Sequence, residues 1–351
     1  MSRKLIYSVI ALFCFVVLLA AFIGIYTLRY LDTPMSIGDK GLTITLSRGD
    51  SLSKVAFDLE RRNVLDYPKW LLAYSRLSGN GLNVKAGEYF LSSGISPRQF
   101  LQKLEQGDVQ YYELTLVEGW SLLQVHNALQ LQEKLQKKVT VDISAQLSTF
   151  LDSPKDSLEG LFFPDTYRYN STTSDIDILL QAYQKMQKVL AEEWSQREQG
   201  LPYESPYEAL VMASLIEKET GAAHERALIS GVFVRRLQMK MRLQTDPTVI
   251  YGLGKKYTGN LQSQHLKDSS NRYNTYRHKG LPPTPIALAG REAIHAALHP
   301  AKGSALYFVA KGDGTHYFSS NLKEHQQAVR KYQILQRSKN YSSAPIRNKN
   351  G

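Results

Sequence analysis

Carboxylates gather at the end of one apolar segment, the stretch EALVMASLIEKET from Glu208 to Thr220. Its apolar run stops at Ile216, and Glu217 and Glu219 come directly after it. A glutamate that is partly withdrawn from water at the end of an apolar helix has a raised pKa, so it can keep the proton that a general acid must donate near neutral pH. The segment therefore predicts an acid–base catalyst, although two ordinary solvated glutamates would give the same pattern.

The two glutamates lie on different faces of that helix, because residues three and four positions apart share a face. The residues on the face of Glu217 are small: Ala213, Ser214, Thr220 and Gly221. Glu219 lies instead beside the bulkier Leu215 and Ile216. Small neighbours leave room for a substrate, so we expect Glu217 to be the catalytic residue and Glu219 to support it.

Metal and phosphate chemistry have weaker support. His295 and His299 stand four apart on a predicted helix, but no His-Glu-x-x-His pattern accompanies them, and the single cysteine, Cys14, lies far away in the sequence. The segment from Gly252 to Lys256 lacks the spacing of a phosphate-binding loop. We expect no metal and no cofactor.

The chain is basic, with 43 Lys and Arg against 32 Asp and Glu and a formal net charge of +11. Such a charge favours an anionic neighbour, which can be nucleic acid, a membrane surface or an acidic polymer. The basic residues are scattered, without zinc-finger spacing or an aromatic RNA-binding signature. We therefore expect solvated faces and no nucleic-acid partner.

An uncharged segment, residues 5–28, predicts a transmembrane helix. At about 1.5 Å per residue it is long enough for a hydrocarbon core of about 30 Å. The apolar core of a cleaved signal peptide is shorter, about 7 to 15 residues. Arg3 and Lys4 precede the segment, and this slight positive bias favours a cytoplasmic stub of residues 1–4 with the rest of the chain outside the cytoplasm.

Residues 29–40 are expected to form a linker, and residues 41–107 a small module. Hydrophobic patterning predicts the order strand, helix, helix, strand, with the strands at 42–46 and 87–91. This order resembles a LysM module, a fold that grips N-acetylated glycans; a spacer domain is the alternative. Ser96 and Pro97 predict the start of another helix, which ends at Gly107.

A short internal repeat links this module to the next part of the chain. Gly49, Ser51, Leu52, Val55 and Leu59 recur at the same spacing as Gly119, Ser121, Leu122, Val125 and Leu129. Five matches suggest a duplicated strand-turn-helix unit or a coincidence, and they are too few to indicate a solenoid.

Residues 108–336 are predicted to form a larger, mixed domain. A strand is expected at 111–117, helices at 178–197 and 207–220, and a hairpin at 305–318 that turns at Gly312-Asp313-Gly314. The polar tail, residues 337–351, is expected to be disordered. The predicted fold class is therefore α+β, with an N-terminal transmembrane helix, a LysM-like βααβ module and a larger mixed α+β domain.

Several segments together resemble the YceG-like family of endolytic murein transglycosylases. In chain order they are SLEG (157–160), FPDTY (163–167), ASLIEKET (213–220), RLQTDPTVIYG (242–252), YNTY (273–276), KGLPPTPI (279–286) and GTHYF (314–318). The resemblance runs in matching order from the apolar segment to about residue 336.

The resemblance implies that Glu217 is the catalytic residue of domain 108–336. It implies cleavage of the β-1,4 bond between N-acetylmuramic acid (MurNAc) and N-acetylglucosamine (GlcNAc) in nascent peptidoglycan, beside the cytoplasmic membrane and near peptidoglycan synthases. It also implies products that end in 1,6-anhydroMurNAc and a cut that terminates glycan elongation. Motif membership makes the following residues candidates for binding substrate, with loop fixing as the alternative role: Ser214, Glu219, Thr220, Gln244, Asp246, Asn274 and Tyr276.

Two other hypotheses stay open. A hydrolytic muramidase would use Asp246 or Glu219 as a second carboxylate. A membrane-tethered glycan-binding scaffold would need no catalyst, and Glu217 would then be replaceable.

Overall fold

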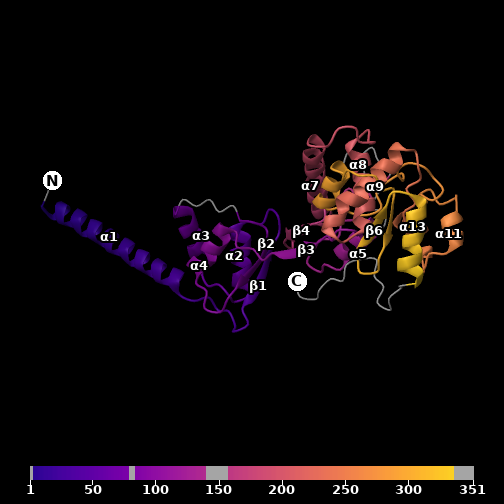
Figure 1. Cartoon of the computed structure of the whole chain (residues 1–351). Coiled ribbons are helices and arrows are strands. Elements are labelled where there is room, and N and C mark those ends of the chain that lie inside the picture. The colour runs from indigo at the N-terminus through magenta and orange to yellow at the C-terminus, as the bar shows by residue number, and fades with distance from the viewer. Residues whose placement is uncertain (1–2, 79–83, 140–156, 336–351) are drawn as a thin grey trace. The chain divides into compact units, whose positions relative to one another are not determined.

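The computed structural model describes residues 3–78, 84–139 and 157–335 (Figure 1). The tail that was expected to be disordered lies outside these residues. The chain forms two compact units. The first comprises Met1–Tyr112, Lys134–Gln136 and Arg168–Thr173, and the second comprises Glu113–Glu133, Lys137–Tyr167 and Ser174–Gly351.

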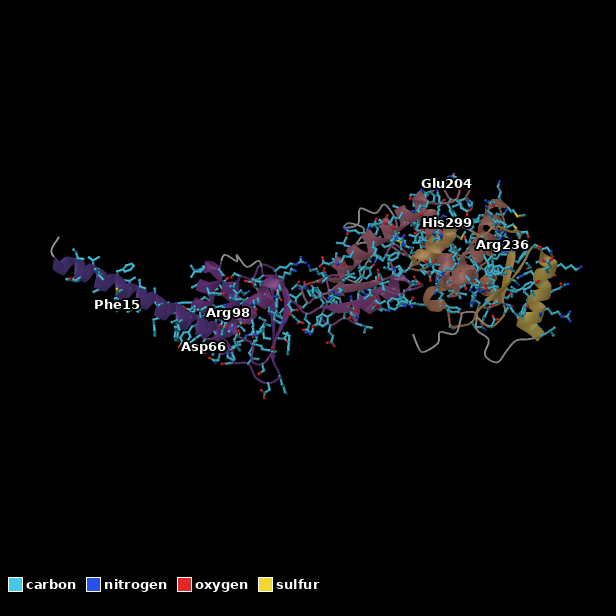
Figure 2. The ribbon with its side chains drawn as sticks, turned by 60° about the vertical axis from the view of Figure 1, so that its left-hand side comes forward. Phe15, Asp66, Arg98, Glu204, Arg236 and His299 are labelled. Carbon is cyan, nitrogen blue, oxygen red and sulfur yellow. The ribbon has the colours of Figure 1, made fainter. Side chains whose placement is uncertain are left out.

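The first unit begins with a long apolar helix, α1 (Arg3–Asp32). The stretch from Ile6 to Asp32 has a mean hydropathy of 2.9. The most apolar part of this stretch is not buried against the rest of the protein. Phe15, for example, projects freely from the helix (Figure 2). The C-terminal end of the helix meets the rest of the unit: Tyr26 contacts Trp70, Leu31 is buried, and Asp32 pairs with Arg98 at 2.7 Å. Such a helix is compatible with a single-pass membrane anchor.

After α1 in the sequence, the first unit has the predicted order of strand, helix, helix, strand. Its elements are β1 (Leu42–Leu46), α2 (Leu52–Arg61), α3 (Pro68–Leu77), β2 (Gly87–Leu91) and α4 (Pro97–Gln106). The strands pair antiparallel, with Ile44 opposite Tyr89. The predicted capping is confirmed, since Ser96 forms a capping box with Gln99 and Gly107 ends α4 in a left-handed conformation. The LysM-like identity of this module stays a prediction.

The second unit is mainly helical. The strands β3 (Tyr112–Thr115) and β4 (Thr166–Tyr169) each have residues in both units. The elements that lie wholly in the second unit are α5 (Leu122–Gln130), α7 (Asp175–Ser195), α8 (Pro206–Glu219), α9 (Arg226–Gln238), α10 (Asp246–Leu253), α11 (Ser263–Lys267), α12 (Arg291–Leu298), β5 (Tyr307–Ala310), β6 (His316–Ser319) and α13 (Leu322–Val329). Helix α8 is central, because α7, α9, α10 and α12 all pack against it. Its residues from Ala209 to Ile216 are buried.

The strand predictions for this unit were partly right. The late hairpin is confirmed: β5 and β6 pair antiparallel, and Gly312 and Gly314 take the positive φ angles that the turn requires. The strand predicted at 111–117 is shorter than expected, and β3 pairs with β4 about fifty residues later in the chain rather than with a sequence neighbour. This partner could not be read from periodicity, which carries no information on pairing.

Candidate functional site

Helix α8 places the candidate acid. Ser205 caps its first turn by accepting a hydrogen bond from Glu208 N, and Pro206 occupies the first helical position. The helix ends at Glu219, where Thr220 turns to an extended conformation. Because the preceding turns are buried, Glu217 emerges from the core and is half-buried itself.

The carboxylate of Glu217 meets the start of another helix. Its Oε2 accepts a hydrogen bond from the backbone N–H of Gly290 at 3.1 Å, and Gly290 is the N-cap of α12. Burial and the nearby Glu118 charge raise the pKa of Glu217, while the Gly290 N–H and the charges of Arg226 and Lys218 lower it. The net effect is a raised pKa, which suits a proton donor.

Glu118 is a neighbour of Glu217 that the sequence analysis missed. It is exposed on the turn between β3 and α5. A Cβ added at Gly290 would meet Glu118 Oε1 at 1.9 Å, so this carboxylate lies directly against Gly290. The internal repeat gave no signal for it, because Glu118 precedes Gly119 at the position that an arginine, Arg48, takes before Gly49.

Glu219 belongs to a different cluster. It accepts a hydrogen bond from the hydroxyl of Thr245, and the Asp246 charge acts on it. Burial raises the pKa of Glu219 to about 7; the Thr245 bond opposes this shift and Asp246 adds to it. Tyr276 donates its hydroxyl hydrogen to Asp246 Oδ1 at 2.7 Å. The structure thus brings together three of the candidate binding residues, Glu219, Asp246 and Tyr276, on the other side of α8 from Glu217.

Gln244 is held next to this cluster. Its backbone has a positive φ of 56°, and its Oε1 accepts a hydrogen bond from Arg236 Nη1 at 3.1 Å. The Arg236 guanidinium, labelled in Figure 2, is buried and also donates to the carbonyl oxygens of Arg242 and Leu243. Arg236 therefore fixes the loop that presents Gln244, whose side chain is exposed.

The other three candidates are buried and bonded to the backbone. Ser214 Oγ accepts from Ile286 N at 3.0 Å, and Thr220 Oγ1 accepts from Ala222 N at 3.0 Å. Asn274 Nδ2 donates to three carbonyl oxygens, those of His265, Leu266 and Asp268. These contacts fit the loop-fixing alternative better than contact with a substrate.

Glu159, in the SLEG motif, is another buried acid. It accepts hydrogen bonds from Leu122 N at 2.8 Å and from the Tyr251 hydroxyl at 3.0 Å. Burial raises its pKa to about 6, although both bonds oppose the shift. Because it joins the start of α5 to α10, Glu159 stabilises the frame around the site.

His295 and His299, the two histidines that stand four residues apart, both have protein partners. Their rings stack at 4.1 Å; His295 Nδ1 lies 2.9 Å from Glu193, and His299 Nε2 lies 2.9 Å from the Gln196 carbonyl oxygen. Within residues 3–78, 84–139 and 157–335, no group of three or more His, Cys, Asp or Glu side chains is arranged to hold a metal ion.

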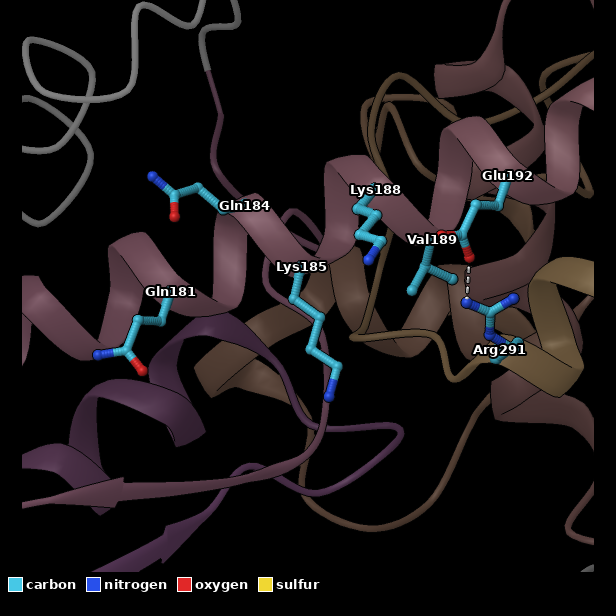
Figure 3. Close-up of a pocket in the computed structure, with 7 residues that line it drawn as sticks. All are labelled: Gln181, Gln184, Lys185, Lys188, Val189, Glu192 and Arg291. Atoms are coloured by element: carbon cyan, nitrogen blue, oxygen red, sulfur yellow. Dashed lines mark hydrogen bonds and ion pairs between the residues drawn. The ribbon is translucent and has the colours of Figure 1, made fainter.

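A surface depression of about 440 Å³ lies along α7 (Figure 3). Its described lining consists of Gln181, Gln184, Lys185, Lys188, Val189, Glu192 and Arg291. Arg291 follows Gly290, but its guanidinium turns toward α7 and pairs with Glu192 at 2.6 Å. Lys185 pairs with Asp165. The depression is thus largely charge-neutralised, and Glu217 is not among its described lining residues.

Comparison with known proteins gives consistent matches. The family model described as the YceG-like family matches residues 44–331. A Bacillus subtilis protein named endolytic murein transglycosylase is 35% identical over 83% of this chain and 84% of its own length. A protein of the same name from Streptococcus pneumoniae is 28% identical over 92% of this chain and 64% of its own length. The 2.6 Å crystal structure of a YceG-like protein from Listeria monocytogenes has 29% identity and a TM-score of 0.52, over 83% of this chain and 99% of that one.

Proposed function

The chain belongs to the YceG-like family, and we propose that it is an endolytic murein transglycosylase, the activity for which its Bacillus and pneumococcal relatives are named. It cuts the β-1,4 bond between MurNAc and GlcNAc inside a glycan strand. The new end is a 1,6-anhydroMurNAc, and the cut stops elongation of that strand.

The observation that carries this proposal is the environment of Glu217. Its raised pKa supplies a proton donor, and the Gly290 N–H orients the carboxyl group. Glu217 protonates the glycosidic oxygen as the bond to the MurNAc anomeric carbon breaks. The 6-hydroxyl of the same MurNAc then bonds to that carbon, and its proton passes to the Glu217 carboxylate. No water is consumed.

One acid–base residue is sufficient for this reaction, because the nucleophile belongs to the reacting sugar. Well-oriented intramolecular reactions reach effective molarities of about 10⁵ to 10⁸ M. The exposed Gln244 and Asp246 and the half-buried Tyr276 are the candidates that remain available to hold acetamido groups and hydroxyls. Ser214, Thr220 and Asn274 are instead occupied by the backbone.

Helix α1 supports a proposed location. We place residues 5–28 in the cytoplasmic membrane and the rest of the chain outside the cytoplasm, where nascent strands leave peptidoglycan synthases. The apolar surface of α1 supports the anchor. Module 41–107, with its LysM-like order of elements, is the proposed second contact with the glycan.

Product analysis tests the activity. Purified glycan strands are digested, reduced with borohydride and analysed by mass spectrometry. A transglycosylase leaves 1,6-anhydro ends that borohydride does not reduce. Reducible ends would instead identify a hydrolytic muramidase, and intact strands would favour a glycan-binding scaffold.

A further inference from the structure

The turn that carries Glu118 is fixed against the site by three hydrogen bonds. Gly119 N donates to Leu288 O at 2.8 Å, and Leu288 N donates to Trp120 O at 2.7 Å. Lys218, the residue after Glu217, donates from Nζ to Gly119 O at 3.1 Å. These contacts tie the turn both to the segment that leads to Gly290 and to the end of α8.

Glu118 and Glu217 therefore converge on one residue. Glu217 Oε2 accepts the N–H of Gly290, while Glu118 Oε1 lies 1.9 Å from the point that a Cβ of Gly290 would occupy. The nitrogen and the Cα of a residue are only about 1.46 Å apart, so both carboxyl groups lie against the same short stretch of backbone. The φ of Gly290, −74°, is open to any residue, so the only obstacle to a larger side chain here is the Glu118 side chain itself.

No structural task explains the position of Glu118. It is exposed, and in the part of the chain that the structure describes no side chain or backbone group is recorded as bonding to it. Holding a second negative charge beside a half-buried carboxyl group is unfavourable unless the charge is used.

We propose that Glu118 is the electrostatic partner of Glu217 and that it serves the second half of the transglycosylase reaction, in which Glu217 must take a proton back. This role rests on the function proposed above. Once Glu217 has given its proton to the leaving oxygen, two carboxylates face each other across Gly290. Their repulsion makes Glu217 a stronger base toward the 6-hydroxyl of MurNAc. Glu118 acts through Glu217 and is therefore a positioning residue.

The other charged groups around Glu217 oppose this effect. Lys218 lies next to it on α8 but is bonded to Gly119, and Arg226 faces it from the start of α9. The Gly290 N–H from α12 also favours the ionised form. Burial and Glu118 together outweigh these three groups, so removing the Glu118 charge changes the balance in a known direction.

The experiment compares pH–rate profiles of the full-length chain in detergent, with purified glycan strands as substrate and anhydro ends as the readout. In Glu118→Gln, the alkaline limb of kcat/KM should move to lower pH and the rate on that limb should fall several-fold, because Glu217 loses its proton earlier. The plateau of kcat should also fall, because the Glu217 carboxylate becomes a weaker base toward the 6-hydroxyl. Glu118→Asp keeps the charge and should restore most of the alkaline activity.

Glu133→Gln, which removes an exposed carboxylate after α5, is the matched control and should follow the wild type. An unmoved alkaline limb in a folded Glu118→Gln protein would overturn the proposal, as would an equal loss of rate at every pH. A wild-type protein that forms no anhydro ends would instead contradict the proposed activity, so the two failures are distinguishable.

Discussion

Glu217 Oε2 accepts the backbone N–H of Gly290 at 3.1 Å, and this single bond joins the C-terminal turn of α8 to the N-terminus of α12. No substitution except proline removes a main-chain donor, so the orientation of the carboxyl group depends mainly on the packing of two helices. That packing is extensive, and Ile294 and Ala297 of α12 are fully buried. The acid is thus held by the core rather than by another flexible side chain.

The first prediction is that Glu217→Gln removes cleavage and leaves the fold intact. The amide keeps the shape, and its oxygen can still accept the Gly290 N–H, but it has no proton to transfer. General acid or base catalysis is worth about 10² to 10⁴ in rate, and a residue that does both should lie at the upper end. Anhydro-end formation measures the loss, and an unchanged circular dichroism spectrum verifies the fold. Retained cleavage would refute Glu217 as the acid.

Gly290→Ala is predicted to reproduce the effect of removing Glu118. The new Cβ would stand 1.9 Å from Glu118 Oε1 and would push this exposed side chain away, at little cost in stability. The alkaline limb of the pH–rate profile should then move to lower pH, as in Glu118→Gln. Gly38→Ala is the control, because its Cβ would meet nothing within 4 Å. A wild-type profile for Gly290→Ala would contradict the proposal that the Glu118 carboxylate acts on Glu217 from its place beside Gly290.

Local features of the fold were predictable from the sequence, whereas the partners of Glu217 were not. Capping at Ser96 and Gly107, the burial of α8 and the exit of Glu217 from it follow from patterns within one element. Gly290 is 73 residues away from Glu217, and only tertiary packing brings it close. The small residues on one face of α8 also suggested room for a substrate beside Ser214. The sequence could not show that the backbone of Ile286 covers that side.

Ser214→Ala tests whether this candidate binds substrate or holds the fold. The substitution leaves the buried N–H of Ile286 without its acceptor, which should cost about 1 to 3 kcal/mol and lower the melting temperature by several degrees. The rate at saturating substrate should stay near wild type. Ser230→Ala is a matched control, since the Ser230 hydroxyl is buried on α9 without a recorded hydrogen-bond partner and its removal should cost little. A fall in activity without a fall in stability would restore Ser214 as a binding residue.

The membrane anchor is testable by fusion and truncation. Because the side chains of α1 are exposed and apolar, deleting residues 1–28 should release the chain from the membrane fraction. Reporters fused at the C-terminus should work only if they are active outside the cytoplasm. A fusion that is active only in the cytoplasm would contradict the proposed orientation.

The last prediction concerns Glu219 and the pH dependence of stability. Burial raises the pKa of Glu219 to about 7 in the folded chain, against an ordinary value of 4.5. Between these two pH values the folded state binds more protons than the unfolded state, so stability falls as pH rises through that window. The contribution of this one group is on the order of 3 kcal/mol.

Glu219→Gln should therefore flatten the decline of stability between pH 4.5 and 7 without abolishing it, because Glu159, with a pKa of about 6, contributes in the same direction. Thermal melts in detergent at pH values of about 4.5, 5.5 and 7 measure the effect. The amide can also accept the Thr245 hydroxyl hydrogen, so the variant should be at least as stable as the wild type near neutral pH. Parallel curves for the two proteins would mean that Glu219 titrates like a solvated glutamate, and its cluster with Thr245 and Asp246 would then be open to water and to substrate.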